Sequence, residues 1–185
     1  NVTQGCVFDN CSFSIVGGTN IEIMSAQGND GAPESMGMVV GLASNTVFKD
    51  CSFDISNVGT ITATDSLINF GGVFGQTYQS TIKETKFNSE SSNYGINIDF
   101  QCGSDDEYDH NYGGIIGLAQ STKIEKIDSC NTEFSIASSD LYNLNYNFGT
   151  FIGQVQGGTV LRELYINSVD ANAVLSGNER AKVNY

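Results

Sequence analysis

The most acidic stretch of the chain is GSDDEYDH, which runs from Gly103 to His110. Asp105, Asp106 and Asp109 carry the hard carboxylate oxygens that Ca²⁺ prefers as ligands. Their spacing, however, matches no calcium-loop motif. We therefore interpret the stretch as a solvated acidic turn, and we expect no metal site there.

His110 is the only histidine, and it lies beside Asp109, as a general base and its orienting carboxylate would. The same place in two related phrases is held by Ile68 and Tyr146, so we interpret His110 as one member of a repeated position. A polysaccharide lyase or hydrolase would gather acids and a base on one sheet face. Because the charges here recur as pairs, we expect no catalytic residue, no cofactor and no enzyme activity.

The chain has five cysteines, and no spacing between them fits a zinc site. Cys11 and Cys51 occupy equivalent positions in two similar nonapeptides. If those segments stack as neighbouring strands, the two residues lie about 4.8 Å apart. That distance permits either a disulfide or a ladder of buried thiols that pack as small hydrophobic groups. An odd count leaves at least one thiol unpaired.

Two glycosylation sequons are present, Asn1-Val2-Thr3 and Asn10-Cys11-Ser12. Asn10 falls at a position that holds charged residues in the other copies, and we expect that position to face outward. Both asparagines are therefore candidate glycan acceptors. The sequons favour an extracellular or cell-surface location.

The composition of the 185 residues indicates a β-rich fold: 39% are hydrophobic, Gly numbers 21, Pro 1 and Trp 0. The formal charge is −13 and the pI is about 4.1. Such a surface repels phosphate backbones, so we expect no nucleic-acid partner. No apolar run approaches the roughly 20 residues that a membrane span needs, so we expect no span in this segment.

A phrase built on Asn, an aromatic residue and Gly recurs along the chain as INFGGVFG, HNYGGIIG and YNFGTFIG. An earlier copy, SMGMVVG, has Ser35-Met36 in place of the Asn and the aromatic residue. The last glycine of the four copies falls at Gly41, Gly75, Gly117 and Gly153, at intervals of 34, 42 and 36 residues. A truncated copy precedes these, since VFDNCSFSI resembles VFKDCSFDI 40 residues later. The sequence thus divides into five copies near 1–36, 37–70, 71–112, 113–148 and 149–185 of a single domain.

Alignment of the copies produces columns of similar residues. The first apolar column holds Phe8, Phe48, Ile82, Ile124 and Leu161. The second, three residues on, holds Cys11, Cys51, Thr85, Ile127 and Leu164, and the third holds Phe13, Phe53, Phe87, Ser129 and Ile166. A charged pair usually separates the first two columns. Strands place alternate residues on one face, so a spacing of three predicts a bend or bulge at that pair. Restoring the register in the last copy requires one extra residue near Gly157-Gly158.

These columns predict an all-β fold: a parallel β-helix, or β-solenoid, of about five coils of 34–42 residues with three or four strands each. The phrase supplies two ladders and a tight glycine corner. The amide ladder would hold Asn69, Asn111, Asn147 and Asn184, and the aromatic ladder Phe70, Tyr112, Phe148 and Tyr185. A further strand is expected at Ile21–Met24, Thr60–Thr64, 95–100, 134–138 and 169–174. Loops near 28–35, 89–94 and 103–109 are expected to project.

The strings GMVVG, GGVFG, GGIIG and GTFIG, each followed by a Ser/Thr-hydrophobic-charged-charged string, resemble the GLUG repeat. That motif is similar to pieces of large secreted and cell-surface proteins. The resemblance implies a parallel β-helix of the broad pectin-lyase type, a fold that serves adhesins, stalks and polysaccharide enzymes alike.

Three functions remain open. The first is a structural segment of a large extracellular repeat protein, which forms or decorates a fibre or surface layer. Its partners would be further coils of the same chain or identical subunits. The second is an adhesin or glycan-binding stalk that contacts other extracellular proteins or glycans, and the third is a polysaccharide lyase or hydrolase. We expect both ends to lack caps, as in a piece of a longer array; a capped monomer is the alternative.

Overall fold

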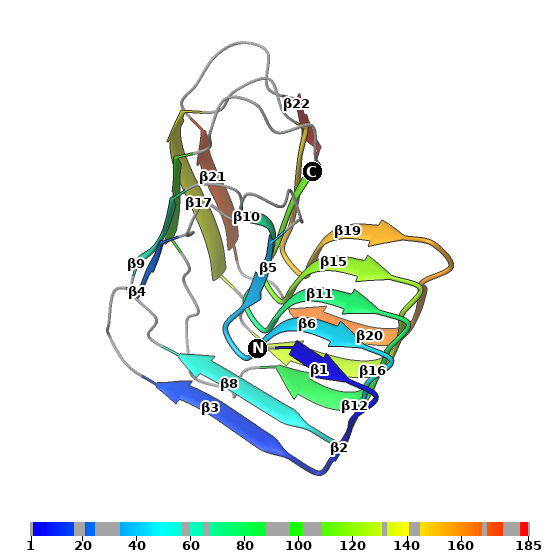
Figure 1. Cartoon of the computed structure of the whole chain (residues 1–185). Coiled ribbons are helices and arrows are strands. Elements are labelled where there is room, and N and C mark those ends of the chain that lie inside the picture. The colour runs from blue at the N-terminus through cyan, green and yellow to red at the C-terminus, as the bar shows by residue number, and fades with distance from the viewer. Residues whose placement is uncertain are drawn as a thin grey trace.

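The computed structural model is a stack of parallel strands wound into successive coils (Figure 1). It describes residues 2–16, 21–24, 34–56, 60–64, 67–87, 97–101, 109–130, 133–140, 145–167, 170–175 and 182–184. Within these ranges every regular element is a β-strand, and strands from successive coils lie above one another in four sheets. The predicted parallel β-solenoid is therefore confirmed.

The first two sheets form one end of each coil. Sheet 1 contains β1 (Val2–Gln4), β6 (Val40–Ser44), β11 (Phe74–Tyr78), β15 (Ile116–Gln120) and β19 (Ile152–Gln156). Sheet 2 is bent and contains β2 (Val7–Asp9), β3 (Ser12–Val16), β7 (Val47–Lys49), β8 (Ser52–Ser56), β12 (Thr81–Phe87), β16 (Lys123–Cys130) and β20 (Val160–Asn167).

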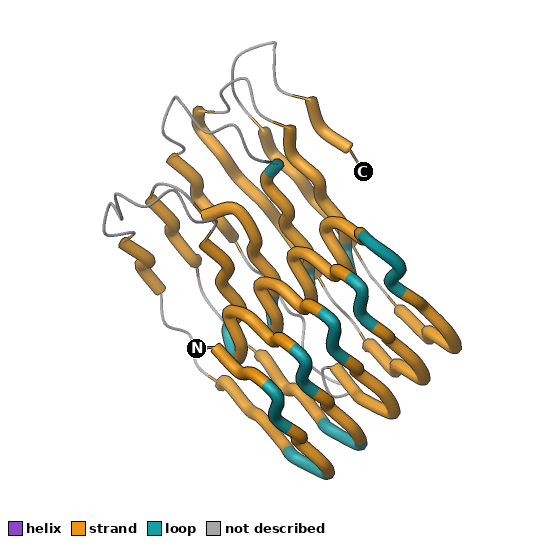
Figure 2. The backbone as a smooth tube through the Cα atoms, turned by 45° about the vertical axis from the view of Figure 1, so that its right-hand side comes forward, coloured by secondary structure: helices purple, strands orange, loops and turns teal. Residues whose placement is uncertain are grey.

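The other two sheets return the chain to the start of the next coil. Sheet 3 contains β4 (Ile21–Met24), β9 (Thr60–Thr64), β13 (Asn97–Gln101), β17 (Glu133–Asp140) and β21 (Asp170–Leu175). Sheet 4 contains β5 (Glu34–Gly37), β10 (Leu67–Gly71), β14 (His110–Gly113), β18 (Asn145–Gly149) and β22 (Lys182–Asn184). The expected additional strand thus exists as sheet 3, and each coil uses all four sheets. Figure 2 shows the coils following one another in a row.

The register of the ladders matches the columns expected from the sequence. Phe8 pairs with Phe48, Phe48 with Ile82, Ile82 with Ile124, and Ile124 with Leu161, all between parallel strands. The extra residue in the last copy is also confirmed. Gln120 pairs with Gln156, an offset of 36, whereas Lys123 pairs with Val160, an offset of 37.

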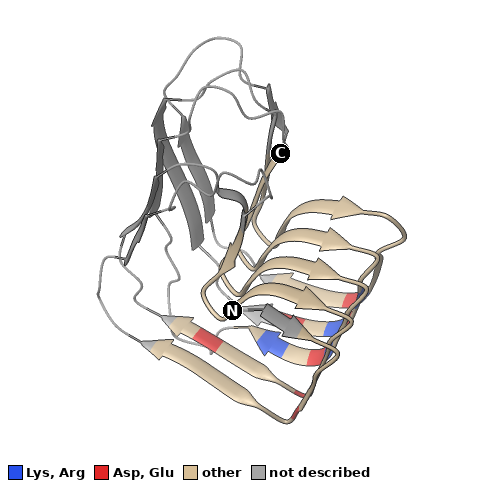
Figure 3. Ribbon diagram, in the orientation of Figure 1, with Lys and Arg blue, Asp and Glu red and all other residues tan. Residues whose placement is uncertain are grey.

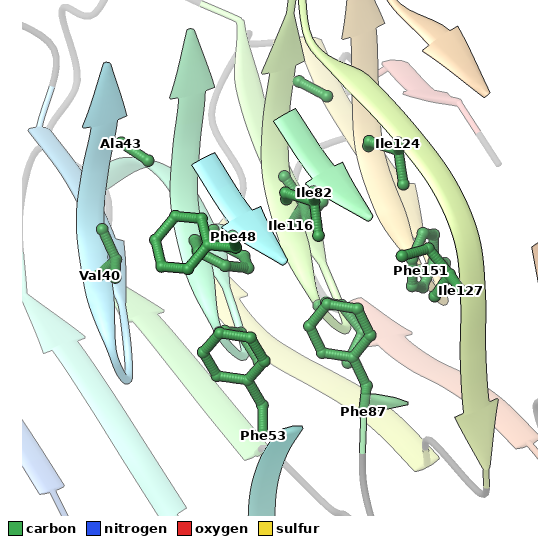
Figure 4. Packing of buried hydrophobic residues seen from close by; sticks show 14 of the residues in the cluster. Val40, Ala43, Phe48, Phe53, Ile82, Phe87, Ile116, Ile124, Ile127 and Phe151 are labelled. Carbon is green, nitrogen blue, oxygen red and sulfur yellow. The ribbon is translucent and has the colours of Figure 1, made fainter. Parts of the chain in front are cut away.

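Phenylalanine rings fill the interior between sheets 1 and 2 (Figure 4). Phe53 stacks on Phe13 with a centroid distance of 4.9 Å and on Phe87 with 5.3 Å. The ring of Phe74, from sheet 1, makes edge-to-face contacts with Phe48, Phe53 and Phe87. Stacked rings follow from in-register strands, because like residues recur at about the strand spacing of 4.8 Å. Burial of these side chains contributes roughly 1.5–3 kcal/mol each.

Glycines form the corner between sheets 4 and 1, because no side chain fits there. A Cβ on Gly117 would lie 2.5 Å from the carbonyl oxygen of Gly75 and 2.6 Å from that of Phe70. A Cβ on Gly71 would lie 1.9 Å from the carbonyl oxygen of Phe74. These neighbours are backbone atoms and cannot move aside as a flexible side chain would. The recurrence of glycine in the phrase thus follows from close backbone packing at the corner.

We predict that Gly117→Ala lowers the free energy of unfolding by about 3 kcal/mol or more, because the added methyl group overlaps backbone on two strands. Gly158→Ala is the matched control: its added methyl meets open space, so only the positive φ of 74° is strained. That control should lose about 1 kcal/mol. Urea unfolding followed by circular dichroism measures both. Equal losses for the two variants would contradict the packed corner.

Candidate functional site

Each coil contains two sharp bends made by residues in the left-handed backbone conformation. The first bend separates sheets 1 and 2 and uses Gly5, Asn45, Gln79, Ser121 and, in the last coil, Gly157 with Gly158. The second falls inside sheet 2. It uses the second residue of each charged pair, Asp50, Glu84, Lys126 and Glu163, and the equivalent uncharged Asn10 of the first coil, with φ between 50° and 53°. The bend predicted from the spacing of three is therefore confirmed. Its cause is a single left-handed residue.

A hydroxyl or thiol closes most of these bends. At the first bend Thr46 donates to the carbonyl of Ser44 at 3.0 Å, and Ser80 and Thr122 do the same across their own bends. At the second bend Thr85 donates to the carbonyl of Lys83 at 2.9 Å, and Cys11 and Cys51 take the equivalent role. The side chain thus gives a second donor to a carbonyl that, at Ser44, Tyr78 and Lys83, already accepts a backbone N–H from the coil before. Sequence reasoning missed this role, although a Ser, Thr or Cys follows every first bend.

Charged residues recur in the strands of sheet 2 (Figure 3), and those at its bend have exposed or half-buried side chains. Lys49 lies 3.1 Å from the carboxylate of Asp50 and 4.0 Å from that of Asp9 in the coil before. Lys126 contacts Glu84 of the coil before at 3.2 Å. Opposite charges of adjacent coils contact one another in these two cases, although Lys49 also lies beside Lys83 in the ladder. The opposite charge within the pair, on Asp50, softens the repulsion of such like neighbours, as expected. Sheet 1, in contrast, contains no charged residue in any of its strands.

These contacts shift the pKa values of several groups. The hydrogen bond to Asp50 raises the pKa of Lys49 above its ordinary value, and the nearby charge of Asp9 raises it further. The hydrogen bond from Lys123 lowers the pKa of Glu125, which also lies 3.9 Å from Arg162. Each shift favours the charged form. The charged residues that these contacts join therefore form ion pairs.

The asparagine ladder runs through three coils and ends on a serine. Asn147 donates through Nδ2 to Oδ1 of Asn111 at 2.8 Å, and Asn111 donates to Asn69 at the same distance. Asn69 then donates to Ser35 Oγ at 3.0 Å. Ser35 in turn donates to Gln76 of sheet 1 at 3.1 Å. Asn184 pairs with Asn147 through its strand. The side chains of the three linked asparagines are buried.

The aromatic ladder runs beside the amide ladder. Phe70, Tyr112 and Phe148 are buried and occupy successive strands of sheet 4, in register. We expected these rings to stack flat on one another. The planes of Tyr112 and Phe148 are instead tilted by 34°, with ring centroids 5.6 Å apart. Tyr185 lies outside the described residues. His110 pairs with Tyr146 in the ladder, so it occupies the repeated position predicted for it. Its side chain is fully buried, and its Nδ1 lies 2.8 Å from the hydroxyl of Tyr112.

The structure holds Cys6, Cys11 and Cys51 as free thiols. Cys51 is buried, and Cys11 is half-buried one coil away. Both thiols point toward backbone carbonyls across their own bends, as described above. Burial raises the pKa of the Cys51 thiol. Of the two alternatives, the structure contains the thiol ladder and no bond between the two sulfurs.

The remaining candidate residues fall into two groups. Asp109 is exposed at the start of β14, and Asn10 is exposed at an outward bend. Asn1, Asp105 and Asp106 lie outside the described residues, as do most of the loops expected to project. Among the described side chains, no group of three or more His, Cys, Asp or Glu is arranged to hold a metal ion.

The described part of the chain contains no helix with the length and apolar character of a membrane span.

The two outermost coils expose side chains that the middle coils bury. Leu161 is 42% exposed, although Ile82 and Ile124 in the same column are fully buried. Val155 is 47% exposed, although Ala43, Thr77 and Ala119 in its column are fully buried. The difference arises because nothing in the described structure covers the outer side of β19 and β20. The end surfaces are therefore the most apolar exposed parts of the described molecule.

Comparison with known protein families, with curated proteins and with solved structures finds no match for this chain.

We predict that Asn111→Ala lowers the free energy of unfolding by about 2–4 kcal/mol. The substitution leaves the buried amide of Asn147 without its acceptor and Asn69 without its donor. Gln156→Ala is the control, since its exposed amide contacts only Gln154, and it should change stability by less than about 0.5 kcal/mol. Denaturant unfolding measures both variants, and similar values would show that the ladder adds nothing.

We predict that a thiol reagent labels the exposed Cys6 of the folded protein at neutral pH well before Cys51. Burial excludes the reagent from Cys51 and, by raising its pKa, also reduces the thiolate that reacts. Mass spectrometry of peptides after timed alkylation measures the order, and full labelling after unfolding is the control. Resistance of Cys11 and Cys51 to labelling in unfolded, unreduced protein would reveal the alternative disulfide.

Proposed function

We propose that this chain is a structural segment of a large extracellular repeat protein, which forms or decorates a fibre or surface layer. Coils stack along the length of the solenoid, and neighbouring solenoids associate side by side. The proposal rests chiefly on one observation: successive coils repeat the same columns and cover one another through parallel, in-register ladders. A repeated coil that covers its neighbour on both sides suits an extended assembly.

The charge distribution supports side-by-side association through sheet 1. A molecule with formal charge −13 repels its own copies. Sheet 1 contains Gln, Ser, Thr, Tyr and aliphatic residues and no charged ones, so two copies can approach there at the smallest electrostatic cost. The ion pairs of sheet 2 neutralise part of the charge without creating a site for a small ligand.

The resemblance to the GLUG repeat supports an extracellular location, and so does the second sequon. Asn10 is exposed at a bend that faces outward, where a glycan has room. A glycan-binding stalk is the second candidate function. The observation in its favour is Tyr165, whose side chain is 67% exposed on β20 and offers a flat aromatic surface.

We predict that the purified chain forms ordered filaments or sheets at high concentration, because the uncharged strands of sheet 1 favour self-association. Negative-stain electron microscopy across a concentration series measures this. The same sample under denaturant, where the strands are unfolded, is the control. Discrete single particles at every concentration would contradict the proposed function, and binding to a glycan array by such particles would favour the stalk.

A further inference from the structure

The bend inside sheet 2 places two adjacent columns on the outside of the molecule. Phe48 and Phe53, on the two sides of the bend, are buried in the core. Lys49 and Asp50, between them, have side chains that are 37% and 46% exposed. We call the two columns the ridge. The leading column contains Asp9, Lys49, Lys83, Glu125 and Arg162, and the trailing column contains the residue after each, Asn10, Asp50, Glu84, Lys126 and Glu163.

The ridge lies in the part of the chain where positive charge is concentrated. Sheet 2 with its bend contains six of the eight basic residues and seven of the 21 acidic ones, so it contributes −1 to the formal charge of −13. A second copy therefore meets little net charge at this surface, although the whole molecule repels it. Each middle coil has both signs side by side on the ridge, as Lys49-Asp50, Lys83-Glu84 and Glu125-Lys126.

We propose that two copies of this chain pack side by side and in parallel through their ridges, around a two-fold axis that runs along the ridge between its two columns. This inference rests on the proposed function, in which solenoids associate laterally. Such an axis sets the leading column of one copy against the trailing column of the other, at the same coil. Lys83 then faces Glu84 of the second copy, and Glu84 faces Lys83. The pairs of the second and fourth coils meet in the same way, so opposite charges face one another in every middle coil.

The charges also disfavour other ways of joining two ridges. The parallel, in-register arrangement matches whatever the number of coils, because each of these pairs contains both signs. A slip by one coil sets Lys83 against Lys126 of the second copy. An antiparallel contact sets each column against itself in reverse order, so that Lys83 meets Lys83 when the contact is centred on the third coil. Like charges across an interface are unfavourable and therefore select the parallel register.

The columns on either side of the ridge fit the same axis. The residue two before the leading column faces the residue two after the trailing column of the second copy. Lys123 therefore lies opposite Asp128 in the fourth coil, and Thr81 lies opposite Lys86 in the third. Neither combination brings like charges together.

The ridge charges already contact opposite charges of their own copy, and they have room for a second contact. Lys49 lies 3.1 Å from Asp50 and Lys126 lies 3.2 Å from Glu84, yet these four side chains are between 36% and 55% exposed. An ammonium group has three donors and a carboxylate has two acceptor oxygens, so each can bind two partners. Exposed ion pairs contribute little individually. Their main effect here is to fix the register, and their number grows with the number of coils.

The contact has a consequence for the proposed layer. A two-fold contact joins two copies and stops there. The uncharged sheet 1 is a separate surface of the coil (Figure 1) and provides the other lateral contact of the proposed function. Alternating contacts through sheet 1 and through the ridge join solenoids into a layer, whereas the ridge alone gives pairs.

The test maps contacts between copies of the 185-residue chain at low ionic strength. Chain of natural isotope content is mixed with an equal amount of chain labelled with ¹⁵N, and a carbodiimide joins amines directly to carboxylates that touch them. Mass spectrometry of the digested product recognises a link between copies, because it combines one light and one heavy peptide. The expected links between copies join residues of one coil: Lys49 with Asp50, Lys83 with Glu84, and Lys126 with Glu125.

Charge variants of the third coil test the two-fold geometry. Lys83→Glu sets carboxylates against one another on both sides of the axis and should reduce the yield of the other ridge links at least about 10-fold. Lys83→Glu with Glu84→Lys should restore most of that yield between identical copies, but not in a mixture with the unmodified chain. Both columns tolerate these residue types, since the fourth coil has Glu125 and Lys126 there. Lys182→Glu, in sheet 4, is the control, because it changes the net charge as much as Lys83→Glu does.

Circular dichroism verifies that each variant folds, and the link map of the unmodified chain tests the register even where a variant does not. Links that join different coils, or that avoid the ridge, would overturn the inference. Equal linking of the doubly substituted chain to itself and to the unmodified chain would overturn it as well. In these cases the proposed function survives through sheet 1 if electron microscopy still shows filaments or sheets. No links between copies, together with single particles at every concentration, would overturn both.

Discussion

In-register parallel stacking is the constraint on which the rest of this structure depends. A residue at any position of the coil has its equivalents about 4.8 Å above and below it. Each position therefore favours residue types that pack or hydrogen-bond well with a like residue in the adjacent coil. Phenylalanine meets this requirement by stacking, and Phe53 lies 4.9 Å from Phe13 and 5.3 Å from Phe87. Asparagine meets it by hydrogen bonding, since its amide both donates and accepts. Charges meet it less well, since neighbours such as Lys49 and Lys83 carry the same sign, and the charged pairs accordingly lie on the outside.

The shape of the coil depends on backbone features that recur in every copy. Left-handed residues turn the chain twice in each coil, and glycines bring it close to its neighbours at the third corner. A left-handed residue other than glycine costs about 1–2 kcal/mol. The side chain that follows the bend offsets part of this cost by donating to a carbonyl across it, as Thr46, Ser80 and Thr85 do. Bends and ladders thus stabilise one another, because each aligned bend also aligns the strands on both sides.

Most of the fold is visible in the sequence because stacking repeats the same physical demand. Column identity alone predicts the pairing of Phe8 with Phe48 and of Asn69 with Asn111, and the spacing of three predicts the bend at Asp50. The roles of Thr46 and Ser80 are not recognisable in advance, because a polar residue in a strand has many possible partners. The tilt between Tyr112 and Phe148 is equally unpredictable, because the column shows that the two residues are neighbours but not how their rings are turned. A site for a ligand leaves no such repeated signal. The charged residues form ion pairs within a coil, as Lys49 does with Asp50, and between coils, as Lys126 does with Glu84.

The proposed fibre repeats along its length the contact that each coil already makes with the next. That view depends on equivalent residues of successive copies lying directly above one another, which a distance measurement tests most directly. Spin labels carried by non-natural amino acids at positions 7 and 160 report the span of one outward column, and double electron–electron resonance measures it. Four steps of the ladder separate these positions, so the backbone distance should be about 19 Å with a narrow distribution. A broad distribution, or a distance more than about twice that value, would contradict the stacked coil.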